Sequence, residues 1–323
     1  MGKPKVGLYW AAGCGGCEEV VVDLAEDLLT VTGAVDIVFW PVAMDFKYQD
    51  VEALKDAELA VVLINGAVRL SEQEHIVKLL RRKSKLVIAN GSCACLGGVV
   101  GLANFSKGIE LINRAYKEVP TVANPLGLTP QSVTREGDKE LELPDFYNTV
   151  KSLNMVIDVD YYIPGCPSTP ELIKDAFMAI LENKLPPKGA VLADTRALCD
   201  TCSRRDTKPE KISIREFKRV YEIEIDPARC FLDQAIICLG LVTRGGCQER
   251  CIKANMPCRG CFGALDNVND QGAKFLSALA SMMDSNDEQE LKRIVDSIPD
   301  PAGLFYRYSL ATSLLRGKID EAK

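Results

Sequence analysis

Short apolar runs alternate with stretches of helical spacing through the first 187 residues of the chain. The apolar runs predict five β-strands, over residues 5–10, 35–40, 59–64, 85–89 and 155–163. Apolar residues at helical spacing predict helices over residues 18–32, 51–57, 71–83, 108–118 and 171–182. Strands that alternate with helices indicate an α/β fold with a doubly wound parallel sheet, and five strands suit a flavodoxin-like order.

Two segments of this part carry further signals. Ser71 begins one predicted helix, and Glu74, three residues later, completes a capping box. Residues 122–145 are instead rich in proline, glycine and charge, which predicts a long loop.

The pattern changes after residue 187. Residues 190–265 hold eight of the 13 cysteines, their strand signals are weak and their glycines are frequent. We expect bound metal rather than an apolar core to order this segment. Residues 270–317 return to helical spacing. The chain is therefore divided into a flavodoxin-like domain over residues 1–187 and a cysteine-rich domain of helices and loops over residues 188–323.

Composition limits where the protein works. With 323 residues, of which 47% are hydrophobic, the chain can bury a core, and its net charge of −6 argues against binding to nucleic acid. No apolar run approaches the roughly 20 residues of a membrane helix, and no signal peptide or twin arginine is visible, so we expect a cytoplasmic protein away from the membrane. In a reducing compartment thirteen thiols favour metal ligation over disulfides.

Four cysteines follow three of the predicted strands. Cys14 and Cys17 form a C-x-x-C unit after the first strand, Cys93 follows the fourth strand and Cys166 follows the fifth. Ligands of open parallel sheets bind at the carboxyl ends of the strands, so these thiols are expected at one rim. Four thiolates suit either a tetrahedral zinc ion or an iron–sulfur cluster. Cys95 is expected to be a buried free cysteine and is the main rival to Cys93.

Other interpretations of these cysteines remain open. A dithiol redox enzyme would use Cys14 and Cys17 alone and would leave Cys93 and Cys166 without a role. The same residues could also be small buried hydrophobic groups.

The later cysteines make two sets of four. The first set is Cys199, Cys202, Cys230 and Cys238, and the second set is Cys247, Cys251, Cys258 and Cys261. Two closed zinc sites would use eight thiols as well, so the number alone does not select the metal. The cysteine run typical of bacterial two-cluster ferredoxins is not present in the sequence.

The order and spacing of the cysteine segments resemble the small subunit of nickel–iron hydrogenases over nearly the whole chain. The segments that carry the likeness are residues 13–19, 91–98, 163–167, 198–202 and 230–263. The chain is most similar to the small subunit of the methyl-viologen-reducing, deazaflavin-non-reducing hydrogenases of methanogens.

This resemblance implies three [4Fe–4S] clusters in a row. It assigns a proximal cluster to Cys14, Cys17, Cys93 and Cys166, a distal cluster to Cys199, Cys202, Cys230 and Cys238, and a medial cluster to Cys247, Cys251, Cys258 and Cys261. It also implies that Glu19 faces the large subunit. An exposed acid at a helix N-terminus explains Glu19 equally well.

The chain departs from many respiratory relatives at both later clusters. Cys199 stands where those relatives have a histidine, and the only histidine, His75, is expected on the surface of a helix. Cys251 adds a fourth medial cysteine, which implies a four-iron rather than a three-iron cluster. The spacing from Cys230 to Cys238 is longer than in those relatives.

The resemblance also implies a division of labour. The large subunit would hold nickel and iron and split hydrogen, while this chain would accept its electrons. A small [2Fe–2S] subunit and heterodisulfide reductase would receive them. A deazaflavin-reducing hydrogenase or a sulfhydrogenase is the alternative within this group, and a zinc-stabilised interaction module is the alternative outside it.

Overall fold

The computed structural model describes residues 2–316, and its first half is built on one parallel sheet. The five strands are β1 (Lys5–Trp10), β2 (Asp36–Phe39), β3 (Leu59–Asn65), β5 (Ser84–Asn90) and β9 (Tyr161–Ile163). They pair in parallel in the order β2-β1-β3-β5-β9, which is the flavodoxin-like order. The predicted fold class is confirmed, although the last strand is only three residues long where the sequence predicts nine.

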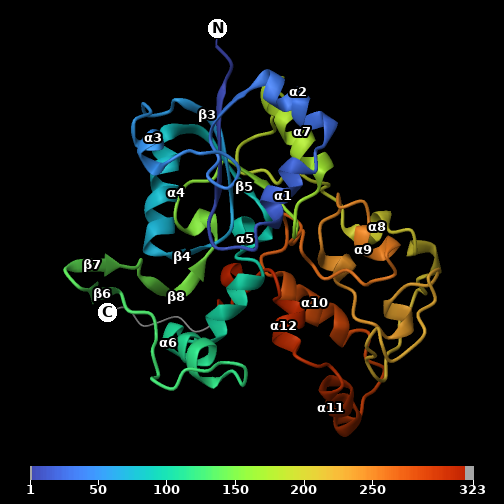
Figure 1. Cartoon of the computed structure of the whole chain (residues 1–323). Coiled ribbons are helices and arrows are strands. Elements are labelled where there is room, and N and C mark those ends of the chain that lie inside the picture. The colour runs from blue at the N-terminus through green and yellow to red at the C-terminus, as the bar shows by residue number, and fades with distance from the viewer. Residues whose placement is uncertain (1, 317–323) are drawn as a thin grey trace.

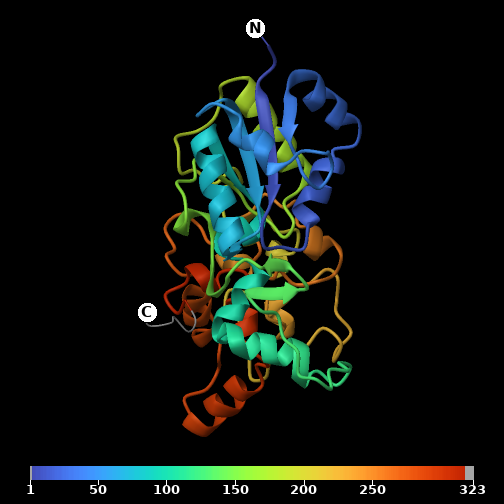
Figure 2. The ribbon, with the colours of Figure 1, turned by 60° about the vertical axis from the view of Figure 1, so that its left-hand side comes forward.

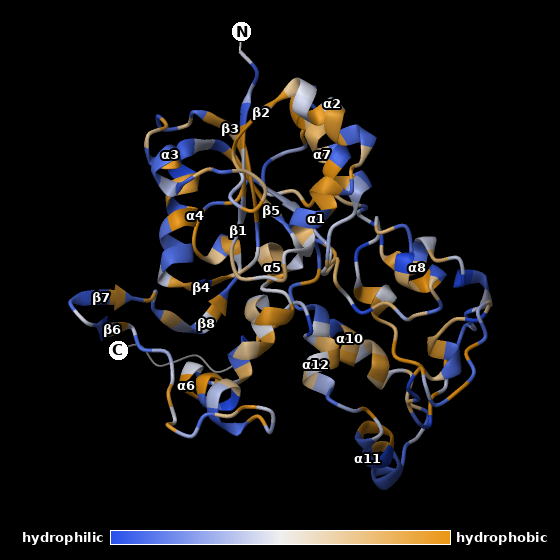
Figure 3. Cartoon of the chain, in the orientation of Figure 1, coloured by the Kyte–Doolittle hydropathy of each residue, from blue (hydrophilic) through white to orange (hydrophobic). Residues whose placement is uncertain are grey.

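Helices cover both faces of this sheet (Figure 1). The helices are α1 (Gly16–Val22), α2 (Glu26–Ala34) and α7 (Pro170–Leu181) on one face, and α3 (Tyr48–Glu52) and α4 (Ser71–Lys83) on the other. Alternate residues of each strand serve the two faces, because Val6 and Leu8 of β1 pack with the first group and Tyr9 packs with the second. Figure 3 shows apolar colour on the helix surfaces that face the strands.

Two predicted details of these helices are wrong. The helix expected over residues 18–32 is two helices, because the chain turns at Ala25, which has a positive φ of 51°. The helix predicted to start at Ser71 does start there, but the expected capping box is absent. Gln73 instead accepts hydrogen bonds from the N–H groups of Arg69 and Leu70.

The segment predicted as a long loop contains a β-hairpin. β6 (Val133–Glu136) and β7 (Lys139–Glu142) pair antiparallel, and every residue in them is exposed. A short second pair joins β4 (Val68–Leu70) to β8 (Phe146–Lys151). Helix α6 (Gly108–Asn113) continues into a π-helical turn to Glu118, and it lies below the hairpin (Figure 2). An exposed hairpin has no buried face, so its sequence lacks the alternation that predicts strands.

The second half has little regular structure and yet has a core of its own. Its helices are α8 (Leu198–Thr201), α9 (Arg250–Lys253), α10 (Gln271–Ala280), α11 (Glu288–Asp296) and α12 (Pro301–Phe305). The expectation that residues 190–265 lack an apolar core of their own is wrong. Buried side chains from this segment form one cluster with those of α10–α12, and they include Leu198, Phe217, Phe231, Leu239, Val242, Ile252, Phe275, Leu279, Ile294 and Phe305. Irregular backbone leaves no period in the sequence, so this core could not be seen there.

The two halves are continuous at the predicted boundary. Past residue 187 the chain still adds a bridge to the edge of the sheet, where Tyr162 pairs with Val191. Within residues 2–316 no single helix has the length and apolar character to cross a membrane, although the bent pair of residues 91–105 and 108–118 meets that test of length and composition.

Candidate metal centres

The first four cysteines lie at one rim of the sheet. Cys14 and Cys17 sit in the loop after β1 and in α1, Cys93 in α5 (Gly91–Leu96) after β5, and Cys166 directly after β9. Burial, together with the smaller influence of the thiols of Cys93, Cys166 and Cys14, raises the pKa of Cys17 to about 12. The electrostatic influence of all three on Cys17 means that the four side chains are neighbours, although they are far apart in the sequence.

Two glycines let the backbone approach these sulfurs. A Cβ atom at Gly91 would lie 2.2 Å from the Cys17 sulfur, and one at Gly98 would lie 2.4 Å from the Cys93 sulfur. Both residues also have positive φ angles, of 83° and 62°. Only glycine fits at these two positions.

Backbone N–H groups point at the same sulfurs. The N–H of Ser168 donates to Cys17, and those of Val99 and Val100 donate to Cys93, where they oppose the rise in pKa that burial causes. Hydrogen bonds of this kind favour the thiolate form that a metal requires. The donor set and its surroundings therefore fit a thiolate-ligated iron–sulfur centre.

Polar side chains at the strand ends hold the C-x-x-C segment in place. The Asn90 amide, at the end of β5, donates to the Cys17 carbonyl at 3.4 Å, and it accepts from the Ser168 hydroxyl at 2.8 Å. The buried Glu18 carboxylate accepts hydrogen bonds from Trp40 Nε1 and Asn65 Nδ2. Burial raises the pKa of Glu18, and these two donors oppose the rise.

Glu18 was not predicted from the sequence, which pointed to its neighbour Glu19 instead. Glu19 is exposed in the first turn of α1, while Glu18 is only 7% exposed. Position in α1 decides which of the two faces the sheet. Trp40 and Asn65, the hydrogen-bond partners of Glu18, lie far away in the sequence. Only the spacing of apolar residues in α1 could therefore have marked Glu18 as buried.

Cys95 occupies a different environment from Cys93. Its side chain is buried in the apolar core on the α4 side of the sheet, and its thiol donates weakly to the carbonyls of Ala89 and Ile163 at 3.4 and 3.5 Å. Burial raises the pKa of Cys95 well above its usual value. Cys17 and Cys93 raise the pKa of Cys95 further, whereas the thiols that raise the pKa of Cys93 are those of Cys166 and Cys14 across the rim.

The second set of cysteines gathers around α8. Burial, together with the smaller influence of Cys238, Cys202 and Cys230, raises the pKa of Cys199 to about 12. The Cys199 and Cys238 sulfurs lie 3.3 and 3.7 Å from the point where a Cβ atom at Gly240 would stand. The structure thus brings these four residues together.

The third set lines one cavity. The cavity has a volume of about 180 Å³, and all four members, Cys247, Cys251, Cys258 and Cys261, border it. Cys166 of the first set borders it as well. Burial raises the pKa of Cys261 to about 12, so a thiolate there needs a positive partner. A group that binds in this cavity touches both halves of the molecule.

The sets do not form a site for a single ion. Within residues 2–316, no group of three or more His, Cys, Asp or Glu side chains is arranged to hold one metal ion. Four thiolates around one zinc ion would stand about 3.8 Å apart, because each Zn–S bond is about 2.3 Å long.

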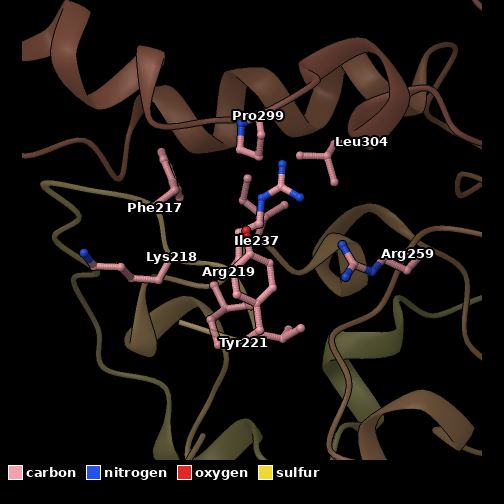
Figure 4. Close-up of a pocket in the computed structure, with 10 residues that line it drawn as sticks. Phe217, Lys218, Arg219, Tyr221, Ile237, Arg259, Pro299 and Leu304 are labelled. Carbon is pink, nitrogen blue, oxygen red and sulfur yellow. The ribbon is translucent and has the colours of Figure 1, made fainter. Parts of the chain in front are cut away.

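A smaller cavity, of about 80 Å³, lies elsewhere in the second half (Figure 4). Arg219 and Arg259 line it together with Ile237, Pro299 and Leu304, and no cysteine borders it. Its lining has no cysteine, histidine or carboxylate side chain, whereas the cysteine sets supply the thiols that a metal centre needs.

Known proteins match this chain over the regions that carry the cysteine sets. Residues 14–180, which include the whole first set, match the family described as the 20 Kd subunit of NADH ubiquinone oxidoreductase. The iron-sulfur subunit of the F420-non-reducing hydrogenase of Archaeoglobus profundus is 39% identical over 318 residues, which cover 98% of each chain. The corresponding vhu subunit of the F420-non-reducing hydrogenase of Methanocaldococcus jannaschii is 37% identical over 318 residues, which cover 97% of each chain.

A solved structure supports the fold. The [NiFeSe] hydrogenase from Desulfovibrio vulgaris Hildenborough aligns with a TM-score of 0.51 at 18% identity, over 81% of this chain and 94% of that chain. The two hydrogenase relatives extend over nearly the full length of the chain at identities well above 30%. The chain therefore belongs to the family of F420-non-reducing hydrogenase iron–sulfur subunits and is a small subunit of a hydrogenase.

Proposed function

We propose that this subunit carries electrons through three [4Fe–4S] clusters, from hydrogen oxidation on a nickel–iron large subunit to a further iron–sulfur subunit. The observation that carries the proposal is the gathering of twelve cysteines into three neighbouring sets of four. Iron–sulfur clusters are held by four cysteine thiolates each. A relative that is 39% identical is itself called an iron-sulfur subunit.

The proximal cluster would be held by Cys14, Cys17, Cys93 and Cys166. The absence of a Cβ at Gly91 and Gly98 leaves room for backbone close to the sulfurs, and nearby N–H groups stabilise negative charge there. A bound cluster supplies a centre that takes up and releases one electron at a time. The chain itself supplies the ligands, their burial and their hydrogen bonds.

The other two clusters follow the same assignment. Cys199, Cys202, Cys230 and Cys238 would hold the distal cluster, and Cys247, Cys251, Cys258 and Cys261 would hold the medial cluster. The cavity bordered by all four medial cysteines supports a four-iron cluster there, because Cys251 lines it with the other three. None of the three sets forms a single-ion site within residues 2–316, which favours a cluster over a zinc ion in each set.

Metal-free, buried thiols such as Cys17, Cys199 and Cys261 are neutral, because burial raises the pKa of each to about 12. Cluster binding must therefore release protons from these ligands, and its free energy contributes to folding. We expect the subunit to take up its clusters as it folds.

The partners are proposed on the same basis. The large subunit would cover the proximal rim, where Cys14, Cys166 and Glu19 are exposed in the isolated chain. A small [2Fe–2S] subunit would receive the electrons and pass them to heterodisulfide reductase, in the cytoplasm. A flavin-containing partner in their place would indicate a deazaflavin-reducing hydrogenase.

Metal analysis of the anaerobically purified complex tests the proposal. Three four-iron clusters predict about 12 iron and about 12 acid-labile sulfide from this subunit, with nickel only in a co-purifying larger chain. Two or three zinc ions without sulfide would overturn the proposal.

Cysteine variants assign the ligands. Cys251→Ser should lose about one iron and leave a three-iron medial cluster, while Cys93→Ala should lose the proximal cluster with its roughly four iron. Cys95→Ala is the matched control and should keep all iron, since its thiol lies in the apolar core. Iron loss from Cys95→Ala with none from Cys93→Ala would exchange their roles.

A further inference from the structure

Two contacts join a cysteine of one set to a cysteine of the next. The N–H of Cys258 donates to the Cys238 sulfur at 3.3 Å, which links the 247–261 set to the 199–238 set. Cys166 and Cys261 border the same cavity, and the backbone of Cys166 lowers the pKa of Cys261, so the first set adjoins the 247–261 set there. Within residues 2–316 no hydrogen bond joins a cysteine of the first set directly to one of the 199–238 set.

These contacts give the three sets a linear order. The 247–261 set contacts Cys166 on one side and Cys238 on the other. It therefore lies between the first set and the 199–238 set. The order follows from the contacts and needs no comparison with other proteins. It agrees with the proposal that this set holds the medial cluster.

We call the contacts Cys166–Cys261 and Cys258–Cys238 the two junctions between the sets. Ser92 lies at the Cys166–Cys261 junction. Ser92 is 1% exposed and lies next to Cys93 at the start of α5. Its hydroxyl donates to the Cys261 carbonyl at 2.5 Å, and its backbone N–H donates to the Gly165 carbonyl at 2.6 Å. Ser92 therefore holds both the segment that carries Cys166 and the segment that carries Cys261.

The Ser92 hydroxyl is the part of this junction that a mutation can remove. The contacts of Cys258 with Cys238 and of Cys166 with Cys261 are made by the backbone of the proposed ligands. No side-chain substitution removes either contact without also affecting a ligand. Loss of the hydroxyl would leave the partly buried Cys261 carbonyl without its donor, and a loop with an unpaired carbonyl shifts to find another. Such a shift would change the contact between Cys166 and Cys261.

We propose that Ser92 is a positioning residue that holds the first and third cysteine sets in register, so that electrons pass between them where Cys166 adjoins Cys261. This inference rests on the proposed function. A single electron crosses each junction from the reduced to the oxidised side, and no covalent bond forms or breaks and no proton moves.

The test uses Ser92→Ala in the complete complex, purified anaerobically with its large subunit and checked for full iron and sulfide. After mixing with hydrogen, freeze-quenched electron paramagnetic resonance follows the reduction of each cluster. The variant should keep wild-type iron, but the step from the first to the third set should slow several-fold. The magnetic coupling between these two clusters and the reduction potential of the third set should change with it.

Two further variants separate positioning from general damage. Ser92→Thr keeps the hydroxyl and should restore both the rate and the coupling. Ser152→Ala is the matched control, because Ser152 is fully buried and its hydroxyl donates to Asn154 at 2.7 Å rather than to a segment that carries a cysteine of the three sets. It should match the wild type in every readout.

The outcomes are distinct from those of the proposed function. Wild-type iron and sulfide content tests whether the clusters exist, while the Ser92 variants test only how they are held. A fully loaded Ser92→Ala enzyme with unchanged rate, coupling and potential overturns the inference. If Ser92→Ala loses iron, the loaded Ser92→Thr enzyme decides, because weakened coupling despite a retained hydroxyl overturns the inference and wild-type coupling supports it.

Discussion

The two halves of the molecule hold their cysteines in different ways. In the first half, Cys14, Cys93 and Cys166 each follow a strand of one parallel sheet, so the backbone ladder fixes where they lie. In the second half the cysteines lie on irregular backbone around an apolar core, with helices of only four residues at α8 and α9. A sheet can place ligands before any metal binds, whereas an irregular segment depends more on the group that it surrounds.

The largest expected effect tests how tightly the first site is built. Gly91→Ala would place a Cβ atom 2.2 Å from the Cys17 sulfur at a φ of 83°, so we expect loss of the proximal cluster. Iron analysis should show a loss of about four iron per chain.

A second glycine variant separates crowding from backbone strain. Gly189 has a φ of 91°, and nothing lies within 4 Å of its missing Cβ. Gly189→Ala should therefore cost only roughly 1–2 kcal/mol of left-handed strain and no iron. Equal iron loss from both variants would contradict the role given to the Cys17 contact.

Removal of the clusters should affect the halves unequally. After iron is chelated, we expect amide hydrogens of residues 198–261 to exchange much faster, while those of β3 and β5 remain protected. The strands pair along their full length, whereas the second segment relies on isolated turns and bridges. Hydrogen-exchange mass spectrometry of the apo and reconstituted subunit measures this, and equal loss of protection in the sheet would remove the distinction.

Two buried arginines provide a matched pair across the halves. Arg204 lies 4.1 Å from the centre of the Phe231 ring, and Arg69 lies 4.2 Å from that of Phe146. Arg204 also donates to three backbone carbonyls and to Asn255, whereas no side-chain nitrogen of Arg69 has an acceptor. The two side chains share an aromatic contact and differ in their hydrogen bonds.

Replacement of each by methionine should therefore have different results. Arg204→Met leaves several buried carbonyls unpaired and should cost about 2–3 kcal/mol of unfolding free energy. Arg69→Met removes a buried charge that has no partner, so it should leave stability unchanged or raise it. Thermal unfolding of the two variants measures the difference, and a comparable loss from Arg69→Met would mean that Arg69 has an acceptor in solution.

The same contrast explains what the sequence could predict. The apolar runs of β1, β3 and β5 are buried on both faces, so they predicted the sheet and with it the rim that gathers Cys14, Cys93 and Cys166. The assignment of the cysteines to three sets came from the order and spacing of the cysteine segments, through their resemblance to a known family. The core around Phe231 and Leu239 was invisible, because irregular backbone imposes no period on buried residues.

Long-range polar contacts were invisible for another reason. The hydrogen bond from Ser92 to Cys261 spans 169 positions, and no local pattern encodes such a pairing. The prediction of the capping residue of α4 was wrong at shorter range. Gln73 and Glu74 can both fold back over the start of the helix, and only the backbone direction selects Gln73. Packing thus decides details that spacing leaves open.

The smallest expected effect lies where the two halves join. Asp160, just before β9, receives the Val87 N–H at 2.8 Å and pairs with Arg81 and with Lys188 at the start of the second half. Burial disfavours its charge, but Lys188, Arg81 and the Val87 N–H outweigh burial, so the pKa of Asp160 is lowered. A carboxyl whose pKa is lower in the folded state stabilises the fold above its unfolded pKa, near 4, and loses this contribution as pH falls through the folded value.

Asp160→Asn should therefore lower stability slightly at neutral pH and weaken its dependence on acid below about pH 4, where the carboxylate would be lost in the wild type. Denaturant unfolding of both proteins from pH 7 down to pH 3 measures the difference. Asp158→Asn is the control, because Asp158 forms no ion pair within residues 2–316 and only its backbone carbonyl accepts from Arg81. If both variants followed the wild-type acid profile, the charge of Asp160 would contribute nothing to the join, and backbone hydrogen bonds between the edge of the sheet and residues 189–192 would hold it there instead.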